Sequence, residues 1–285
     1  MKTPKSIEPL IHDGIVDEVV CQLKSGKEAT VYLVRCGSEM RCAKVYKEAN
    51  NRSFRQATEY QEGRKVKNSR RARAMEKGSR YGRKEQESAW QSAEVDALYR
   101  LAAAGVRVPK PHGFFEGVLL MDVVCDADGD AAPRLSDVLL TPEQAREYHR
   151  FLIGQVVLML CAGLVHGDLS EFNILLSHEG PVIIDLPQAV DAAGNNHASR
   201  MLERDVNNLV DYFGRFAPEL LTTHYAKEIW RLYEDSKLTP TTPLTGLFEQ
   251  KLVAPDVKSV MREIEDVRAE EMRRQARMSE MEARE

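Results

Sequence analysis

Short apolar runs separated by polar turns open the chain and predict a β-rich first part. Three of these runs are rich in Val, Tyr and Cys, and they cover residues 16–23, 30–35 and 41–46. We expect them to form an antiparallel meander. Residues 113–124 show the same pattern around Glu116 and Gly117, which predicts a hairpin that turns at these two residues.

One segment of the first part has helical spacing instead. In residues 89–104, apolar positions at Val95, Leu98 and Leu101 lie between charged ones, and Gly105 follows the last of them. This spacing places the apolar side chains on one face of an amphipathic helix that ends at the glycine.

Helical patterns dominate the second part. Thr141, Pro142 and Gln144 form a typical helix start, with an N-cap, a proline in the first turn and a capping glutamine, so a helix should run from here to about residue 162. Further helices are expected at residues 200–216, at 218–233 and from 256 onward. Short strands are expected at residues 174–176 and 182–184.

These patterns together predict an α+β fold with a small antiparallel lobe and a larger, mostly α-helical lobe. We place the first lobe at residues 1–124, with one helix and a basic insertion at about 48–88. The second lobe should cover residues 125–240, and residues 241–285 should form a charged helical tail.

The composition is that of a globular protein, with 43% hydrophobic and 29% charged residues. The five cysteines form no Cys-x-x-Cys pair, and their odd number argues against a disulfide framework or a zinc cluster, so we expect a reducing cytoplasm. The first residues lack the apolar segment of a secretory signal. No apolar stretch reaches the roughly 20 residues of a membrane span, so we expect no membrane association.

The net charge of −4 conceals a strongly basic segment. Between Arg64 and Lys84 there are ten basic residues and one acidic residue, a local charge of +9 that leaves −13 for the rest of the chain. One interpretation is a solvated loop. The other is a surface that contacts phosphate, such as an RNA backbone or a ribosomal particle.

The segment from His166 to Leu175 carries the clearest chemical pattern. Asp168 is followed five positions later by Asn173, on a loop between a buried helix and a strand. This is the spacing of a phosphotransferase catalytic loop, in which the Asp accepts the proton of a hydroxyl substrate and the Asn coordinates Mg²⁺.

A second carboxylate, Asp185, ends an apolar strand. If a tight turn joins this strand to the one after Asn173, the two side chains lie close enough to share a Mg²⁺ ion, which prefers oxygen ligands. An isolated Asp at a strand end more commonly caps a turn, but the company of Asp168 and Asn173 favours metal binding.

Lys44 stands inside an apolar strand, where a charged side chain needs a partner. ATP phosphates and a helix carboxylate are suitable partners, and Glu94 lies on the expected face of the 89–104 helix. Asp96 competes, but it is about 200° around the helix from Glu94. The loop at residues 25–32 has one glycine, so it matches neither a GxGxxG loop nor a Walker motif.

Six motifs in this order resemble the RIO family of atypical serine/threonine protein kinases, and they are closest to the prokaryotic-like, type-one branch. They are Ser-Gly-Lys-Glu-Ala-Thr-Val-Tyr (25–32), Ala-Lys-Val-Tyr-Lys (43–47), Ala-Pro-Arg-Leu-Ser-Asp-Val (132–138), His-Gly-Asp-Leu-Ser-Glu-Phe-Asn (166–173), Ile-Asp-Leu-Pro-Gln-Ala-Val (184–190) and Arg-Asp-Val-Asn-Asn-Leu (204–209). The resemblance implies a bilobal protein-kinase-like fold with a shortened second lobe.

The resemblance also implies roles for individual residues. The phosphates of ATP would be covered by Ser25, Gly26, Lys27 and Val31 and contacted by Lys44, which Glu94 would hold. Adenine would meet the gatekeeper Met121 and the backbone of Asp122 and Val124. Asp168 would be the proton acceptor, Asn173 and Asp185 would bind Mg²⁺, and Asp185 could itself be phosphorylated.

Three functions are compatible with these residues. The leading hypothesis is an ATP- and Mg²⁺-dependent kinase acting on Ser and Thr of proteins, including its own chain, with an ATPase activity through an aspartyl phosphate. The second is a small-molecule kinase of the aminoglycoside or choline type. The third is an ATP-switched factor of ribosome assembly.

Overall fold

The computed structural model describes residues 3–26, 28–47 and 93–248. Of the two compact units of the chain, Met1–Phe248 contains all of these residues, and Glu249–Glu285 contains none. The basic segment at 64–84, the predicted helix from 256 and the candidate phosphate-loop residue Lys27 therefore lie outside the described residues.

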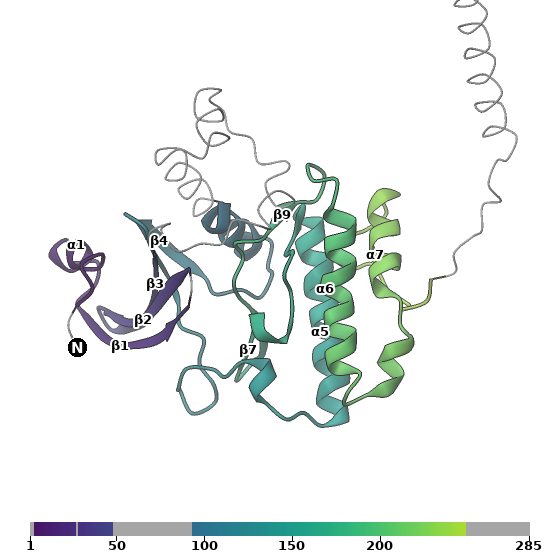
Figure 1. Cartoon of the computed structure of the whole chain (residues 1–285), viewed down its shortest axis with the longest axis horizontal. Coiled ribbons are helices and arrows are strands. Elements are labelled where there is room, and N and C mark those ends of the chain that lie inside the picture. Colours follow the sequence, from purple (N-terminus) through teal and green to yellow (C-terminus); the bar gives the residue numbers. More distant parts are fainter. Residues whose placement is uncertain (1–2, 27, 48–92, 249–285) are drawn as a thin grey trace, which may run out of the picture. The chain divides into compact units, whose positions relative to one another are not determined.

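A five-stranded antiparallel sheet forms the first lobe (Figure 1). Its order is β1-β2-β3-β5-β4, and the strands are β1 (Glu18–Ser25), β2 (Ala29–Cys36), β3 (Glu39–Tyr46), β4 (Pro111–Phe115) and β5 (Val118–Asp122). Glu116 and Gly117 form the β4–β5 turn with φ values of 44° and 85°. Both the predicted meander and the predicted hairpin are confirmed.

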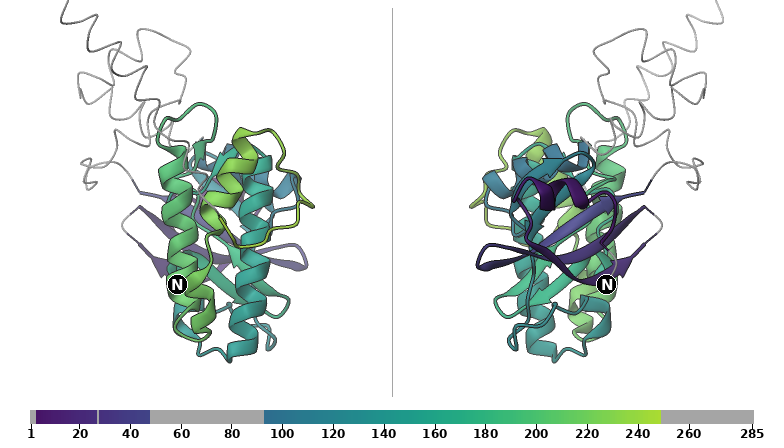
Figure 2. Two further views of the ribbon diagram at one scale, coloured as in Figure 1. Left: turned by 90° about the vertical axis from the view of Figure 1, so that its right-hand side faces the viewer. Right: turned by 90° about the vertical axis from the view of Figure 1, so that its left-hand side faces the viewer.

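One face of this sheet is covered by α1 (Glu8–His12), a short helix that the sequence patterns did not predict (Figure 2, right). Ile7 and Leu10 are buried against Val34 and Ala43 of the sheet. The amphipathic helix predicted at residues 89–104 is described over residues 93–103, and its predicted apolar positions Val95, Leu98 and Leu101 are buried. Helix α1 therefore covers the outer face of the sheet, and the inner face packs against the helix over 93–103 and the second lobe.

Three helices form the body of the second lobe and lie side by side (Figures 1 and 2). They are α5 (Pro142–Cys161), α6 (Ala198–Phe213) and α7 (Tyr225–Glu234). The N-terminus of α5 has the predicted capping box, because the Gln144 amide donates to Thr141 Oγ1 and Gln144 Oε1 accepts from the Thr141 amide.

Short elements surround these helices. They are β6 (Leu164–Val165) paired with β9 (Val190–Asp191), β7 (Ile174–Ser177) paired with β8 (Gly180–Ile183), and the 3₁₀ helices η3 (Leu135–Asp137), η4 (Glu171–Asn173) and η5 (Pro218–Thr222). The two strands predicted after residue 173 are confirmed as the β7–β8 hairpin.

The single helix predicted for residues 218–233 is wrong, because η5 and α7 are separate elements. Thr222 and Thr223 donate their hydroxyl protons to the carbonyl oxygens of Glu219 and Leu220. The amide of His224 donates to the Gly246 carbonyl (2.8 Å) and not to the Leu220 carbonyl, as a continuing helix needs. Local hydroxyl bonds of the threonine kind also compete with helix formation.

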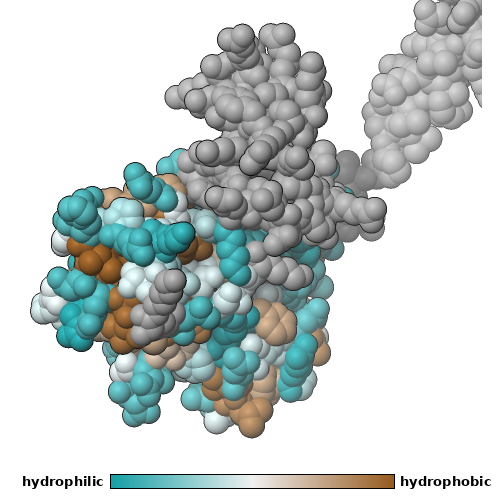
Figure 3. Space-filling view, turned by 60° about the vertical axis from the view of Figure 1, so that its left-hand side comes forward, coloured by the Kyte–Doolittle hydropathy of each residue, from teal (hydrophilic) through white to brown (hydrophobic). Residues whose placement is uncertain are grey.

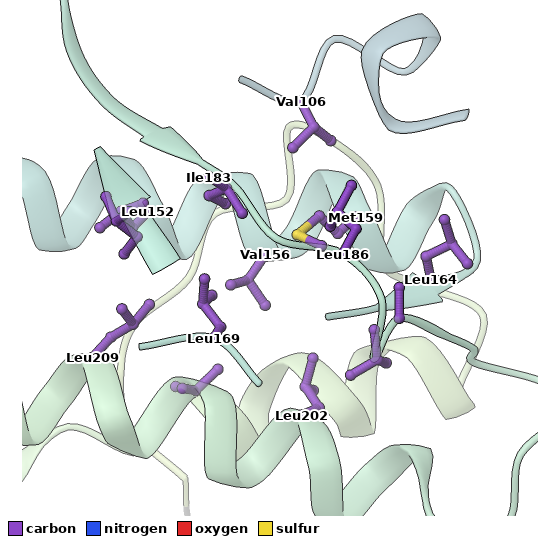
Figure 4. Close-up of a cluster of buried hydrophobic side chains, with 14 of the residues drawn as sticks. Val106, Leu152, Val156, Met159, Leu164, Leu169, Ile183, Leu186, Leu202 and Leu209 are labelled. Atoms are coloured by element: carbon purple, nitrogen blue, oxygen red, sulfur yellow. The ribbon is translucent and has the colours of Figure 1, made fainter. Parts of the chain in front are cut away.

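Buried aliphatic side chains from α5, α6 and the connecting strands make the main core (Figure 4). Leu169 comes from the loop that carries Asp168, and it is fully buried in this cluster, among side chains such as Val156 and Leu202. The segment before β4 is joined to the second lobe by bonds from Arg107 N to Gln155 Oε1 (2.7 Å) and from Ile183 N to Arg107 O (2.9 Å). The core therefore anchors the loop on which the predicted chemistry depends.

The arrangement confirms the predicted α+β, bilobal, protein-kinase-like fold. None of the helices in the described ranges is long and apolar enough to cross a membrane. On the face shown in Figure 3, hydrophobic residues lie in small groups among hydrophilic ones.

Candidate active site

Helix α6 fixes the backbone of the loop between β6 and η4. The carboxylate of Asp205 is buried and accepts hydrogen bonds from the amides of Gly167 (2.7 Å) and Leu169 (3.0 Å). Asn208 donates to the Leu169 carbonyl (2.9 Å), and Arg204 donates to that of Gly167. Burial raises the pKa of Asp205 to about 7, although these amides and Arg204 act to lower it. The residue flanked by these bonds is Asp168.

His166 lies beneath the same loop and is buried. Its Nδ1 is 3.3 Å from the amide of Asp168, which donates to it, and its Nε2 is 3.1 Å from the carbonyl oxygen of Ile184. Burial lowers the pKa of His166. A neutral ring with the proton on Nε2 satisfies both contacts, so His166 connects the loop to the end of β8.

The predicted pair Asp168 and Asn173 is in contact. The Asn173 amide nitrogen donates to the carbonyl oxygen of Asp168 (2.8 Å) and lies 3.4 Å from its carboxylate. This use of the nitrogen leaves the side-chain oxygen of Asn173 as its atom for a cation. The Ile184 amide donates to the Asn173 carbonyl (3.0 Å), which brings Asp185 beside the pair, as the hairpin prediction required.

Asp185 has the left-handed backbone conformation, with φ of 67°. This conformation is uncommon for a residue with a side chain, and it redirects the chain at the end of β8. The carboxylate lies 3.0 Å from the ammonium of Lys44, across the two lobes. Burial raises the pKa of Asp185, but the charge and hydrogen bond of Lys44 outweigh it, so the pKa is lowered and the carboxylate is ionised.

Lys44 has a second carboxylate partner, Glu94, at 2.5 Å. Glu94 is only 4% exposed, whereas Asp96 is exposed, which decides between the two acidic residues of the helix. Glu94 also accepts a hydrogen bond from the Tyr46 hydroxyl (2.7 Å). Burial acts to lower the pKa of Lys44, but the charges of Glu94 and Asp185 exceed it and hold that pKa above its ordinary value.

The β1–β2 turn carries the candidate phosphate loop. Ser25 Oγ is 3.3 Å from Thr30 Oγ1, and the Gly26 amide donates to the Ala29 carbonyl (2.9 Å). The ammonium of Lys47 donates to Ser25 Oγ (3.0 Å) and to the Gly26 carbonyl (2.6 Å). The turn is thus held by side chains of β2 and of the end of β3.

A cavity of about 650 Å³ lies between these groups. This volume is in the range of small-molecule and cofactor sites. Eight of the predicted residues line it: Gly26, Val31, Lys44, Met121, Asp122, Val124, Asp168 and Asp185. Ser25, Glu94 and Asn173 do not line it. Glu94 and Asn173 contact the lining residues Lys44 and Asp168, and Ser25 is bonded to Lys47, which also bonds the lining residue Gly26.

Several residues of the candidate site were not singled out in the sequence. Lys24, Arg134 and Asp137 also line the cavity, and the last two belong to the 132–138 motif. Asp205 and Tyr46 likewise belong to motifs noted in the sequence. An acidic residue on the apolar face of α6 is the signal that could have identified Asp205.

The oxygen atoms of the site suit a cation that is coordinated partly by the protein and partly by a nucleotide. Within the described ranges, no cluster of three or more His, Cys, Asp or Glu side chains could hold a metal by itself. The carboxylate of Asp185 and the amide oxygen of Asn173 are hard oxygen donors, and Mg²⁺ commonly takes one or two protein ligands together with phosphate oxygens. The residues present therefore fit the expected ion.

Comparisons with known proteins identify the family that the chain resembles. The RIO domain family model matches residues 30–226. The chain is 38% identical over 217 residues to the RIO-type serine/threonine-protein kinase Rio1 of Haloferax volcanii, covering 74% of this chain and 68% of the relative. It is 32% identical over 215 residues to the serine/threonine-protein kinase rio1 of Schizosaccharomyces pombe and 31% identical over 228 residues to the human serine/threonine-protein kinase RIO1.

The matches to these two eukaryotic relatives include 72% and 79% of this chain. They span only 40% and 38% of the relatives' own length.

Proposed function

Because the chain belongs to the RIO family, whose matched relatives are serine/threonine-protein kinases, we propose that it transfers the γ-phosphoryl group of ATP to Ser and Thr hydroxyls of proteins, its own chain included. One observation carries the proposal. Lys44 joins Glu94 and Asp185 at the wall of a cavity that also contains Asp168. A cation, a metal-binding carboxylate and a proton acceptor are the parts that phosphoryl transfer requires.

In this proposal, Asp168 accepts the proton of the attacking hydroxyl, which lets the oxygen form its bond to phosphorus as ADP leaves. Lys44 neutralises phosphate charge, and Glu94 holds Lys44. The turn with Ser25, Gly26, Lys27 and Val31 covers the phosphates, while Met121 and the backbone of Asp122 and Val124 meet adenine. Asp205 keeps the Asp168 loop in place through its two amide bonds.

Asn173 and Asp185 would hold Mg²⁺, and the ion would supply neutralisation of charge on the phosphate oxygens. All five cysteines are free thiols, which suits a reducing compartment such as the cytoplasm.

The ionised carboxylate of Asp185 supports a related ATPase activity. Its oxygen would attack the γ-phosphorus, release ADP and form an aspartyl phosphate, and water would then release inorganic phosphate. Such a cycle suits a switch in ribosome assembly, with Arg64–Lys84 contacting RNA or a ribosomal particle.

One experiment separates these outcomes. The purified chain is incubated with ATP labelled at the γ-phosphorus and Mg²⁺, and the labelled product is identified. We expect acid-stable phosphoserine or phosphothreonine on protein. Label found only in an alkali-labile acyl phosphate would favour the ATPase switch, and label transferred to aminoglycosides or choline but not to protein would favour a small-molecule kinase.

A further inference from the structure

Both oxygens of the buried Glu94 carboxylate have a donor. Oε1 is 2.5 Å from the Lys44 ammonium, and Oε2 is 2.7 Å from the Tyr46 hydroxyl, which donates to it. Glu94 is 4% exposed and Tyr46 is 9% exposed, so water cannot readily replace either donor. The roles described above account for Lys44 and Glu94 but leave Tyr46 without one.

The position of the Tyr46 hydroxyl follows from the sheet. Residues two apart on a strand point to the same face, so Lys44 and Tyr46 of β3 both face the helix over 93–103. The Tyr46 ring meets the edge of Phe114, with ring centroids 6.2 Å apart at 75°. Its backbone pairs with Ala29 of β2. Packing therefore fixes the ring, and the ring fixes the direction of the hydroxyl.

Two donors on opposite oxygens constrain the carboxylate in a way that one donor does not. If Lys44 were the only donor, Oε2 would have no partner, and the carboxylate could rotate about its last side-chain bond. Leaving a buried charged oxygen unpaired is costly. Tyr46 also lies under the ammonium itself, with Lys44 Nζ 5.5 Å from the ring centroid, a distance at which a ring attracts a cation.

We propose that Tyr46 is a positioning residue that acts through Glu94 to hold the Lys44 ammonium where nucleotide phosphates bind. The inference rests on the proposed function, because it assumes that the cavity takes ATP. In this proposal the hydroxyl of Tyr46 contributes to phosphate binding indirectly, by way of Glu94 and Lys44, and the ring contributes to packing. Recognition of the adenosine part does not involve it.

This division of roles gives a direct test with two probes. Tyr46→Phe keeps the ring and removes the hydroxyl, and binding of adenosine and of ATP is measured by calorimetry. We expect the affinity for ATP to fall roughly 10- to 150-fold, the effect of one hydrogen bond to a buried charge. Adenosine has no phosphate, so its affinity should stay unchanged.

Tyr32→Phe is the matched control. Tyr32 is a partly buried tyrosine of β2 that packs with the cluster on the outer face of the sheet. The Tyr32→Phe variant should bind adenosine and ATP with the same affinities as the unchanged chain. Equal losses for adenosine and ATP in Tyr46→Phe would reduce Tyr46 to a packing residue, and no loss for either would contradict the proposal outright.

Failure of the proposed function is a separate result. If the unchanged chain bound no ATP, the proposed function and this inference would both fall. If it bound ATP and Tyr46→Phe bound it equally well, only the inference would fall.

A double substitution covers the case in which Tyr46→Phe does not fold. Glu94→Gln removes the buried charge that would be left unpaired, so Tyr46→Phe combined with Glu94→Gln should fold. Its affinity for ATP should equal that of Glu94→Gln alone, because Tyr46 has no charge left to position. A further loss in the double variant would overturn the proposal.

Discussion

Asp168 is the residue whose removal tests the proposed chemistry most directly. Asp168→Ala should lower the rate of phosphate transfer by roughly 10²- to 10⁴-fold, the usual contribution of a general base. The affinity for ATP should change little, because Lys44 and Glu94 remain paired. Single-turnover transfer and nucleotide binding are measured on the same preparation. A variant that transfers phosphate at the full rate would remove Asp168 as the proton acceptor.

His149 of α5 gives a prediction about stability. It is 1% exposed, its ring contacts the rings of Phe213 and Tyr225, and its Nε2 has no hydrogen-bond partner within the described residues. Burial lowers the pKa of His149 from 6.5 to about 4. The folded chain thus binds the proton less readily than the unfolded chain, so this stabilisation is complete above pH 6.5 and is lost as the pH falls towards 4.

The loss from His149 should reach about 2 kcal/mol between pH 8 and pH 5. Urea unfolding of the unchanged chain and of His149→Leu at both pH values measures it. The drop in the free energy of unfolding should be smaller in the variant by about that amount. The exposed His178, changed to Leu, should leave the drop unaltered, and an equal drop in all three proteins would show that His149 has no part in it.

Candidate residues could be predicted where the neighbouring positions of the sequence mark them. The spacing of Asp168 and Asn173 and the charge of Lys44 in an apolar strand are visible along the chain. Tyr46 was not identified, because a tyrosine in a strand is ordinary and its role depends on a contact with a residue 48 positions away.

Helix α6 links the body of the second lobe to the loop with Asp168. Asp205→Asn should keep the shape of the side chain but present an amide group where two backbone amides need acceptors. We expect the free energy of unfolding to fall by about 1–3 kcal/mol, the cost of a lost buried acceptor. The turnover number should fall more than the affinity for ATP, because the loop and not the phosphate contacts is disturbed.

Asn208→Ala provides the matched control for α6. This substitution removes one hydrogen-bond donor to the same loop, the side-chain amide that bonds the Leu169 carbonyl. Denaturant unfolding and steady-state kinetics of both variants are compared. If Asp205→Asn turned over ATP like the unchanged chain, the loop would not depend on α6 for its geometry.

At the scale of elements, periodicity predicted the long helices and the strand pairs but not their interruptions. At the break between η5 and α7, two threonine hydroxyls bond to nearby carbonyls and the His224 amide bonds to Gly246, and an apolar pattern does not indicate such bonds. The helix α1 has five residues, too few for a periodic signal, and is stabilised by packing of Ile7 and Leu10 on the sheet.

At the scale of the molecule, the two lobes were predictable and the way they meet was not. Lys44 and Asp185 are 141 positions apart, and a contact at that separation follows from the packing of the sheet against the second lobe. Nothing in the periodicity of either segment indicates which residues should face each other across the cavity.

The charge distribution belongs to this scale as well. If the +9 segment contacts RNA, binding of a single-stranded RNA oligonucleotide should weaken steeply with salt, by about 0.7 in the logarithmic slope for each phosphate neutralised. Removing residues 70–84 should abolish this binding and leave ATP affinity intact. Filter binding at several salt concentrations provides the measurement, and RNA binding by the shortened chain that ignores salt would contradict the assignment.

The contact between Lys44 and Asp185 has a thermodynamic consequence. In the described structure an oxygen of Asp185 is committed to the ammonium. An anion that draws Lys44 away makes that oxygen available to a cation, and a cation on Asp185 in turn releases Lys44 for the anion. Binding of the anion should therefore raise the affinity for the cation by the same factor by which the cation raises the affinity for the anion. We expect the two ligands to bind the cavity together more tightly than either binds alone.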